Sequence, residues 1–265
     1  MTITSNNSNN YLSNSKLIIL DSDGVVIEEN NIINQSDIFI SEVRKLGKTV
    51  IIFTNNSTKH PIELNKFYKE KNIEIDELLT SSILTKNYCE SESIHSAYII
   101  GEKGLVDIVT EAGIQIKSTS PDAVIVGMDR FLTYEKLTIA TRAIRNGSRF
   151  IATNPDNTFP TPRGLEPGAG TMIAALKAST DKEPEVILGK PSVFGYNMIL
   201  NKYKLSPSEV LMIGDRYETD IIGAIQLNIP SLIINTGIAK YRKQPGKYRD
   251  YPEVDVIPDL MSLLN

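Results

Sequence analysis

The chain has 265 residues, of which 41% are hydrophobic and 23% are charged, a composition typical of a globular protein with one large domain or two smaller ones. Its 28 basic and 32 acidic residues leave a net charge of −4, and lysine and arginine are scattered along the chain, so we expect no nucleic-acid partner. No apolar run approaches the ~20 residues that span a bilayer, and the N-terminus lacks the apolar and basic regions of a secretory signal, so neither membrane insertion nor export is expected.

Residues 1–15 are rich in Asn and Ser, and we predict that they form a flexible tail. Cys89 is the only cysteine, so no intramolecular disulfide can form and a zinc site built on cysteines is not expected. A reducing, cytoplasmic location fits this cysteine usage.

Strands and helices are predicted to alternate along the rest of the chain. Short runs rich in Val and Ile predict buried strands at Leu17 to Leu20, Val50 to Phe53, Ala123 to Val126, Phe150 to Ala152, Val186 to Leu188, Val210 to Ile213 and Leu232 to Ile234. Helical spacing predicts helices at Ile62 to Lys71, Leu105 to Ala112, Tyr134 to Arg145, Met172 to Ala178, Val193 to Tyr203 and Thr219 to Leu227. This alternation predicts an α/β fold with a mainly parallel sheet.

The first predicted strand ends in two carboxylates and a glycine, in the order Asp21, Ser22, Asp23 and Gly24. Ligands of open α/β sheets bind at the carboxyl ends of the strands, and a glycine there lets the chain turn sharply beside a bound group. Taken alone, the same residues fit an ordinary Asp-Gly turn equally well.

The second predicted strand ends in Thr54, Asn55, Asn56 and Ser57, about one strand-helix-strand unit after Asp21. Their side-chain and backbone donors could hold phosphate oxygens, although a polar turn after a strand is the ordinary alternative. Further along, Lys190 stands between Gly189 and Pro191 just past a strand, where its charge could stabilise a transferring phosphoryl group. A single lysine is more often a solvated charge.

Another predicted strand ends in Gly214 and Asp215, with Asp220 five residues further on. The alternative is that Asp215 caps a helix and Asp220 is a solvated residue of its first turn. Beside Asp21 and Asp23 we prefer a shared cation site, because clustered carboxylates need a compensating cation and an all-oxygen cluster suits Mg²⁺.

The order of these segments resembles the haloacid dehalogenase-like phosphohydrolases, and within them the NagD-like, p-nitrophenyl phosphatase group. The resemblance rests on Asp21-Ser-Asp23-Gly-Val, Thr54-Asn-Asn-Ser, Gly189-Lys190-Pro-Ser and Gly214-Asp215-Arg-Tyr-Glu-Thr219-Asp220. Thr153-Asn-Pro-Asp156-Asn-Thr-Phe-Pro160, Gly164-Leu-Glu-Pro-Gly168-Ala-Gly170-Thr and Val126-Gly-Met-Asp129 are similar to elements of that group's cap domain. The resemblance covers nearly the whole chain after the tail.

The resemblance implies a Rossmann-like parallel-sheet core domain, residues 16–79 and 183–265, with an inserted α/β cap domain at 80–182. It implies a Mg²⁺-dependent phosphatase that hydrolyses small phosphate monoesters through an aspartyl phosphate. In this mechanism Asp21 is the nucleophile and Asp23 is the acid and base, while Lys190 stabilises charge.

The resemblance also implies the remaining roles at the site. Phosphate would be held by Gly24, Thr54, Asn55, Asn56 and Lys190, and the metal by Asp21, Asp23 (through its backbone carbonyl) and Asp215. Asp220 would orient this shell without binding the metal itself.

In the cap, we expect a loop from Asn154 to Gly170 to be the specificity element, with Asn154, Asp156 and Phe159 as the specificity candidates. Pro167 to Gly170 could hold an anion at a helix N-terminus, but we prefer a structural helix start.

Three other functions share this scaffold. A phosphomutase or other phosphotransferase would keep the core motifs with a different cap, and a dehalogenase would need neither a metal nor Asp23. A non-catalytic regulator that binds phosphometabolites would not need the four residues Asp21, Asp23, Lys190 and Asp215. We expect a small phosphate ester as the substrate, Mg²⁺ as the cofactor, no nucleic-acid or membrane partner, and a monomer or homodimer.

Overall fold

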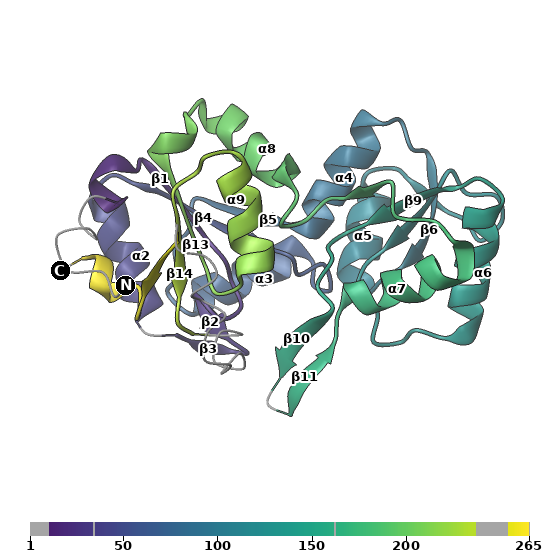
Figure 1. Ribbon diagram of the computed structural model, residues 1–265, viewed down its shortest axis with the longest axis horizontal. Helices are drawn as coiled ribbons and strands as arrows, with labels where there is room; N and C mark the ends of the chain where they lie inside the picture. The colour runs from purple at the N-terminus through teal and green to yellow at the C-terminus, as the bar shows by residue number, and fades with distance from the viewer. Residues whose placement is uncertain (1–10, 34, 162, 237–253, 265) are drawn as a thin grey trace. The chain divides into compact units, whose positions relative to one another are not determined.

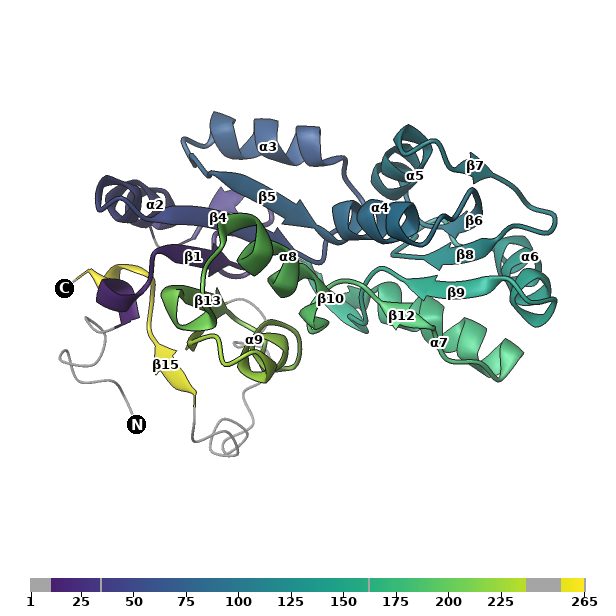
Figure 2. The ribbon, with the colours of Figure 1, turned by 90° about the horizontal axis from the view of Figure 1, so that it is seen from above.

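The structure is a computed structural model that describes residues 11–33, 35–161, 163–236 and 254–264. Contacts divide these residues into two compact units (Figures 1 and 2). The first takes the described residues of 1–54, 65–78 and 196–265, and the second takes 55–64 and 79–195. The predicted fold class, a parallel-sheet α/β core with an inserted α/β unit, is confirmed. No helix among the described residues is both long and apolar enough to cross a membrane.

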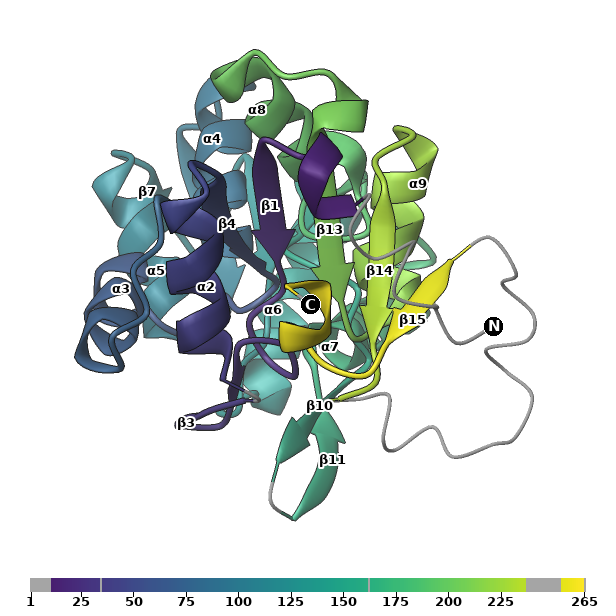
Figure 3. The same ribbon diagram turned by 90° about the vertical axis from the view of Figure 1, so that its left-hand side faces the viewer.

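The first unit is built around a six-stranded sheet in the order β15-β14-β13-β1-β4-β5, and Figure 3 shows several of these strands side by side. Its strands are β1 (Leu17–Leu20), β4 (Thr49–Thr54), β5 (Glu77–Thr80), β13 (Val210–Gly214), β14 (Ser231–Ile234) and β15 (Asp255–Ile257). All four residues of β1 are fully buried, as expected for a central parallel strand covered on both faces.

Helices cover both faces of this sheet, with α2 and α3 on one side and α8 and α9 on the other (Figure 2). They are α2 (Ser36–Lys45), α3 (Pro61–Glu70), α8 (Val193–Tyr203) and α9 (Ile222–Gln226). The predicted helix from Thr219 begins earlier, as a π-helical turn (Tyr217–Ile221) that leads into α9. A short hairpin of β2 (Ile27–Glu28) and β3 (Asn31–Ile32) follows the first motif.

The second unit has a five-stranded sheet in the order β12-β9-β8-β6-β7, whose strand pairs are all parallel. Its elements are α4 (Ser81–Ser91), β6 (Ser96–Ile100), α5 (Lys103–Glu111), β7 (Gln115–Ile116), β8 (Ala123–Val126), α6 (Tyr134–Arg145), β9 (Arg149–Ala152), α7 (Ala169–Thr180) and β12 (Val186–Ile187). Helices α6 and α7 pack on one face of the sheet through a shared apolar cluster that includes Val124, Phe150 and Leu176.

Two sequence expectations need correction. The predicted tail over 1–15 does not extend to its last five residues, because Leu12 is buried and Lys48 donates to the carbonyl oxygens of Leu12 and Ser15. Residues 1–10 lie outside the described residues. The stretch from Asn154 to Gly170 is not a plain loop, because β10 (Thr158–Thr161) and β11 (Gly164–Pro167) pair as an antiparallel hairpin (Figure 1).

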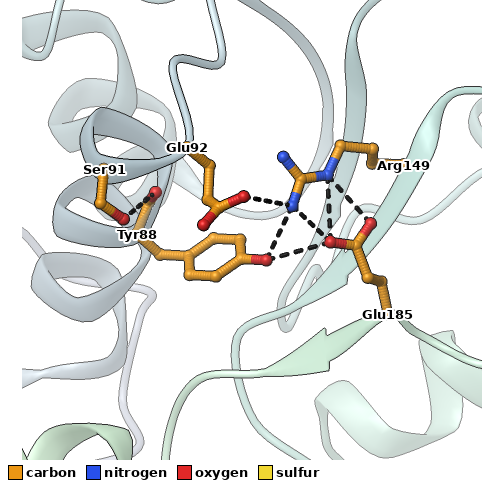
Figure 4. Close-up of polar contacts among 5 residues, drawn as sticks. All are labelled: Tyr88, Ser91, Glu92, Arg149 and Glu185. Carbon is orange, nitrogen blue, oxygen red and sulfur yellow. Dashed lines mark hydrogen bonds and ion pairs between the residues drawn. The ribbon is translucent and has the colours of Figure 1, made fainter.

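A network around Arg149 ties α4 to β9 and to the residue before β12 (Figure 4). The Arg149 guanidinium donates to Glu185 (Nε to Oε2, 2.9 Å) and to Glu92 (Nη2 to Oε2, 3.1 Å). It also donates to the Tyr88 hydroxyl at 2.8 Å, and its Cζ atom lies 5.6 Å from the centre of the Tyr88 ring. Hydrogen bonds from Arg149 hold the pKa of Glu185 below its ordinary value. This arrangement fixes a polar helix to the edge of the sheet.

Candidate active site

The first motif and the Asp215 motif meet at the carboxyl edge of the six-stranded sheet. Strands β1 and β13 are parallel neighbours in which Leu20 pairs with Ile213. The backbone N–H of Asp21 continues this pairing by donating to the Ile213 carbonyl oxygen at 3.0 Å. The register therefore places Asp21 and Asp215 at the ends of adjacent strands, on one edge of the sheet.

Three carboxylates form an acidic cluster at this edge, namely Asp21, Asp215 and Asp220. Each offers an oxygen within 4.8 Å of the others, and they are the one group of this kind among the described residues. Their exposed fractions are 9%, 4% and 2%. Buried like charges at such distances repel one another unless a cation compensates them. A set of hard carboxylate oxygens therefore fits a divalent cation such as Mg²⁺.

Asp220 also shapes the loop that carries Asp215. Its Oδ2 atom accepts hydrogen bonds from the backbone N–H groups of Asp215 at 3.1 Å and Arg216 at 3.0 Å. Gly214 is required by this packing, because a Cβ atom there would lie 2.2 Å from the Cβ of Asp220. The Tyr196 hydroxyl donates to the Asp220 carbonyl oxygen at 2.7 Å.

Asp23 lies outside the acidic cluster and its side chain is exposed. It stands in a tight turn in which the Ser22 carbonyl oxygen accepts from Val26 and Ile27 at 2.9 and 3.0 Å. Gly24 has a φ of 93°, a left-handed conformation that glycine adopts without strain. The turn therefore presents the Asp23 carboxyl group to solvent two residues from Asp21.

In the second unit, Asn55 joins two other predicted site residues. Its Nδ2 atom donates to the Asp156 Oδ2 atom at 2.9 Å and to the Lys190 carbonyl oxygen at 3.0 Å. Lys190 is buried, with 1% of its surface exposed. Asn56 closes a local turn, because its Oδ1 atom accepts from the backbone N–H and the hydroxyl of Thr58, both at 2.9 Å.

The three specificity candidates of the cap differ in their surroundings. Asn154 is buried and donates to the carbonyl oxygen of Asn55 at 2.9 Å, so its side chain holds the loop. Asp156 contacts Asn55 as described above. Phe159 lies on β10 opposite Glu166 and is half-buried. The structure thus brings Asn154 and Asp156 to Asn55, whereas Phe159 belongs to the hairpin.

Several residues that support the site have no signal in the sequence. Tyr196 on α8 donates to the carbonyl oxygen of Asp220. Tyr68 on α3 contacts Ser22, with 2.5 Å between the two hydroxyl oxygens. Ser81 at the start of α4 donates to the Asn55 carbonyl oxygen at 2.7 Å. In the sequence, residues at such helix positions cannot be distinguished from ordinary core or capping residues, and they belong to no motif.

Comparison with known proteins gives one consistent group. A family model described as haloacid dehalogenase-like hydrolase matches residues 18–115, and a related model of HAD-hydrolase-like sequences matches 187–263. An acid sugar phosphatase of Staphylococcus haemolyticus is 37% identical over 240 residues, which are 89% of this chain and 91% of the relative.

Solved structures give the same result. The p-nitrophenyl phosphatase of Archaeoglobus fulgidus superimposes with a TM-score of 0.88 at 28% identity, over 95% of this chain and 98% of that one. NagD from E. coli K-12 superimposes with a TM-score of 0.81 at 25% identity, over 93% and 97% of the two chains.

Proposed function

The chain belongs to the NagD-like group of haloacid dehalogenase-like hydrolases and is a phosphatase, and from this premise we propose that it hydrolyses small phosphate monoesters through an aspartyl phosphate on Asp21. The observation that carries the proposal is the acidic cluster. Its three buried carboxylates come from two separate motifs and meet beside the end of β1.

In the proposed reaction a carboxylate oxygen of Asp21 attacks phosphorus, and the bond from phosphorus to the ester oxygen breaks. Asp23 donates a proton to the departing oxygen. In the second half, Asp23 takes a proton from water as that water attacks phosphorus, and the bond to Asp21 breaks to release phosphate. The exposed carboxyl group of Asp23, two residues after the nucleophile, suits a group that exchanges protons in both directions.

Asp21 and Asp215 would hold a divalent cation through their carboxylates, together with the backbone carbonyl of Asp23, and Mg²⁺ is the ion we propose. When bound, such a cation supplies charge that offsets the repulsion between the carboxylates and a phosphate group. Asp220 would orient this shell, because one of its oxygens already accepts two backbone N–H groups of the Asp215 loop.

Gly24, Thr54, Asn55, Asn56 and Lys190 are proposed to hold the phosphoryl oxygens. Lys190 would contribute its positive charge, and Thr54 its hydroxyl. Asn55 would contribute its backbone N–H, because both hydrogens of its side-chain amide are donated to Asp156 and Lys190.

The substrates we propose are small phosphate esters, with sugar phosphates first because a relative that is 37% identical to this chain is named an acid sugar phosphatase. We also propose that the protein works in the reducing cytoplasm. Cys89 is the sole cysteine and is buried, and this burial raises the pKa of its thiol to about 12, which makes it an inert core residue.

Phosphate release from p-nitrophenyl phosphate, with Mg²⁺ or with a chelator, tests the activity. We expect release only with the metal, and a loss of about 10³-fold or more in Asp21→Asn, because an amide cannot act as the nucleophile. Asp37→Asn, in the first turn of α2, is the matched control and should keep full activity. Substantial turnover by Asp21→Asn would refute the covalent route.

A further inference from the structure

The side chain of Asn55 connects two segments that are distant in sequence from Asn55 and from each other, one containing Asp156 and the other Lys190. Its two amide hydrogens are donated to the Asp156 carboxylate and to the Lys190 carbonyl oxygen. Because both of these neighbours are acceptors, the amide nitrogen must face them and the orientation of the amide is fixed. The Asn55 side chain therefore links the loop after β9 to the segment after β12 through two hydrogen bonds.

The other end of the Asn55 amide fits closely against the same segment. Its Oδ1 atom is buried and has no hydrogen-bond partner. A Cβ atom at Gly189 would lie 2.4 Å from this oxygen and 2.7 Å from the Thr153 carbonyl oxygen, so only glycine fits at that position. The Gly189 N–H donates to the same Thr153 oxygen at 2.7 Å. The backbone at Gly189 and Lys190 is thus held against Asn55 and Thr153 from two directions.

Asp156 is itself held firmly by its backbone. Its N–H donates to the Asn154 Oδ1 atom at 3.2 Å, and its carbonyl oxygen accepts from Gly170 N–H at 2.8 Å at the start of α7. Gly168 is also packed against this carbonyl, since a Cβ atom there would lie 2.3 Å from the oxygen. A carboxylate on so rigid a support can fix the position of whatever donates to it.

A hydrogen bond to a carboxylate is roughly twice as strong as one between neutral groups. Without Asp156, one Asn55 hydrogen would lose its acceptor and the amide could rotate away from Lys190. The Lys190 backbone would then lose the contact that ties it to the Asn55 loop.

We propose that Asp156 is a positioning residue which, through Asn55, fixes the backbone of Gly189 and Lys190 and with it the lysine that acts on the phosphoryl group. This inference rests on the proposed phosphatase function. It gives Asp156 a role different from recognition of the leaving group, because the Asp156 carboxylate acts through Asn55.

The substrate dependence of Asp156→Ala separates these two roles. A positioning residue serves the phosphoryl group, which all substrates share, so we expect kcat to fall by the same factor, about 10- to 100-fold, for p-nitrophenyl phosphate and for several sugar phosphates. KM should change little. Losses that differ strongly between substrates would overturn the proposal in favour of leaving-group recognition.

Asp156→Asn should recover most of the activity, because its amide oxygen can accept from Asn55 in place of the carboxylate. Asn55→Ala should cost about as much as Asp156→Ala, and the double variant should cost no more than Asn55→Ala alone, since both changes break one pathway. Additive losses would show that the two residues act independently and would overturn the proposal.

Asp122→Ala is the matched control. Asp122 lies just before β8, and its carboxylate also fixes backbone groups, because it accepts from the N–H groups of His95 at 3.0 Å and Ser96 at 2.8 Å. It should lower the melting temperature and leave kcat unchanged. If Asp156→Ala behaves in the same way, its role is only structural and the proposal fails.

Hydrogen exchange provides a readout that does not depend on turnover. We expect Asp156→Ala to speed amide exchange in the peptide that contains Gly189 and Ser192, whose N–H groups bond to Thr153 and Gly189 carbonyl oxygens. Unchanged exchange there would refute the positioning role. An inactive wild-type protein would instead refute the proposed function, and the exchange result would still decide the role of Asp156.

Discussion

Asp220 combines two tasks that a substitution can separate. One of its oxygens accepts two backbone N–H groups from the Asp215 loop, and the carboxylate belongs to the acidic cluster. In Asp220→Asn the amide oxygen can keep the loop contacts, while the negative charge of the cluster decreases by one. We expect the fold to persist and the Mg²⁺ concentration for half-maximal activity to rise about 10- to 100-fold.

A titration of activity against Mg²⁺ checks this expectation, with circular dichroism to confirm the fold. Asp220→Ala is the comparison, because it removes the charge and the loop contacts together and should be worse in both metal requirement and stability. If Asp220→Asn has the Mg²⁺ requirement of the wild type, the Asp220 charge plays no part in holding the metal.

At the scale of single residues, the sequence predicts the placement of Asp21 and Asp215, because each stands at the end of an apolar run, whereas Asp220 follows a polar stretch and its place in the acidic cluster was not predicted. The end of a buried parallel strand and the identity of the next residue are both readable, so Asp21 and Asp215 could be placed on one edge. The contact between Asn55 and Asp156 could not be predicted in this way. It joins residues 101 positions apart whose meeting depends on how two loops fold.

At the scale of elements, most central strands and most helices were predictable, since continuous apolar runs and 3.6-residue spacing are strong signals, although the interior strand β6 was missed. The hairpin of β10 and β11 was missed because Pro160, Gly164 and Pro167 are unusual in strands. Helix α4 was missed because it is largely polar, with the sequence SSILTKNYCES. Its position depends on contacts such as the Arg149 network.

The Arg149 network predicts a loss of stability in Arg149→Lys. The guanidinium donates to two carboxylates and a hydroxyl and packs over the Tyr88 ring, whereas one ammonium group cannot make all of these contacts. Because the network is partly exposed, we expect a cost of only about 1 kcal/mol in the free energy of unfolding. Thermal unfolding should show a melting temperature lower by about 4 °C.

The pH dependence of unfolding provides the control. Glu185 has a lowered pKa in the folded state, so its contribution to stability is present above its ordinary pKa of 4.5 and is lost as pH falls through the folded pKa. Arg149→Lys should therefore destabilise the protein at neutral pH and matter less in acid. Equal destabilisation at both pH values would mean that packing, and not the ion pairs, accounts for the loss.

At the scale of the whole molecule, each unit has its own parallel sheet and its own buried core. All three carboxylates of the acidic cluster belong to the first unit, and the Arg149 network belongs entirely to the second. Domains with separate cores can unfold in separate steps. Ligand binding then stabilises only the unit that contains the binding site, because linkage acts on the state that binds.

We therefore expect Mg²⁺ to raise the melting temperature of one calorimetric transition and leave the other in place. At a concentration about 100 times the dissociation constant the stabilisation is about 2.7 kcal/mol, which corresponds to a shift of about 5–10 °C. Asp215→Asn should abolish the shift, and Arg149→Lys should lower only the transition that Mg²⁺ does not move. If the same transition responds to both Mg²⁺ and Arg149→Lys, the two units do not unfold independently. If Mg²⁺ shifts neither transition, the acidic cluster does not hold the ion in the free enzyme.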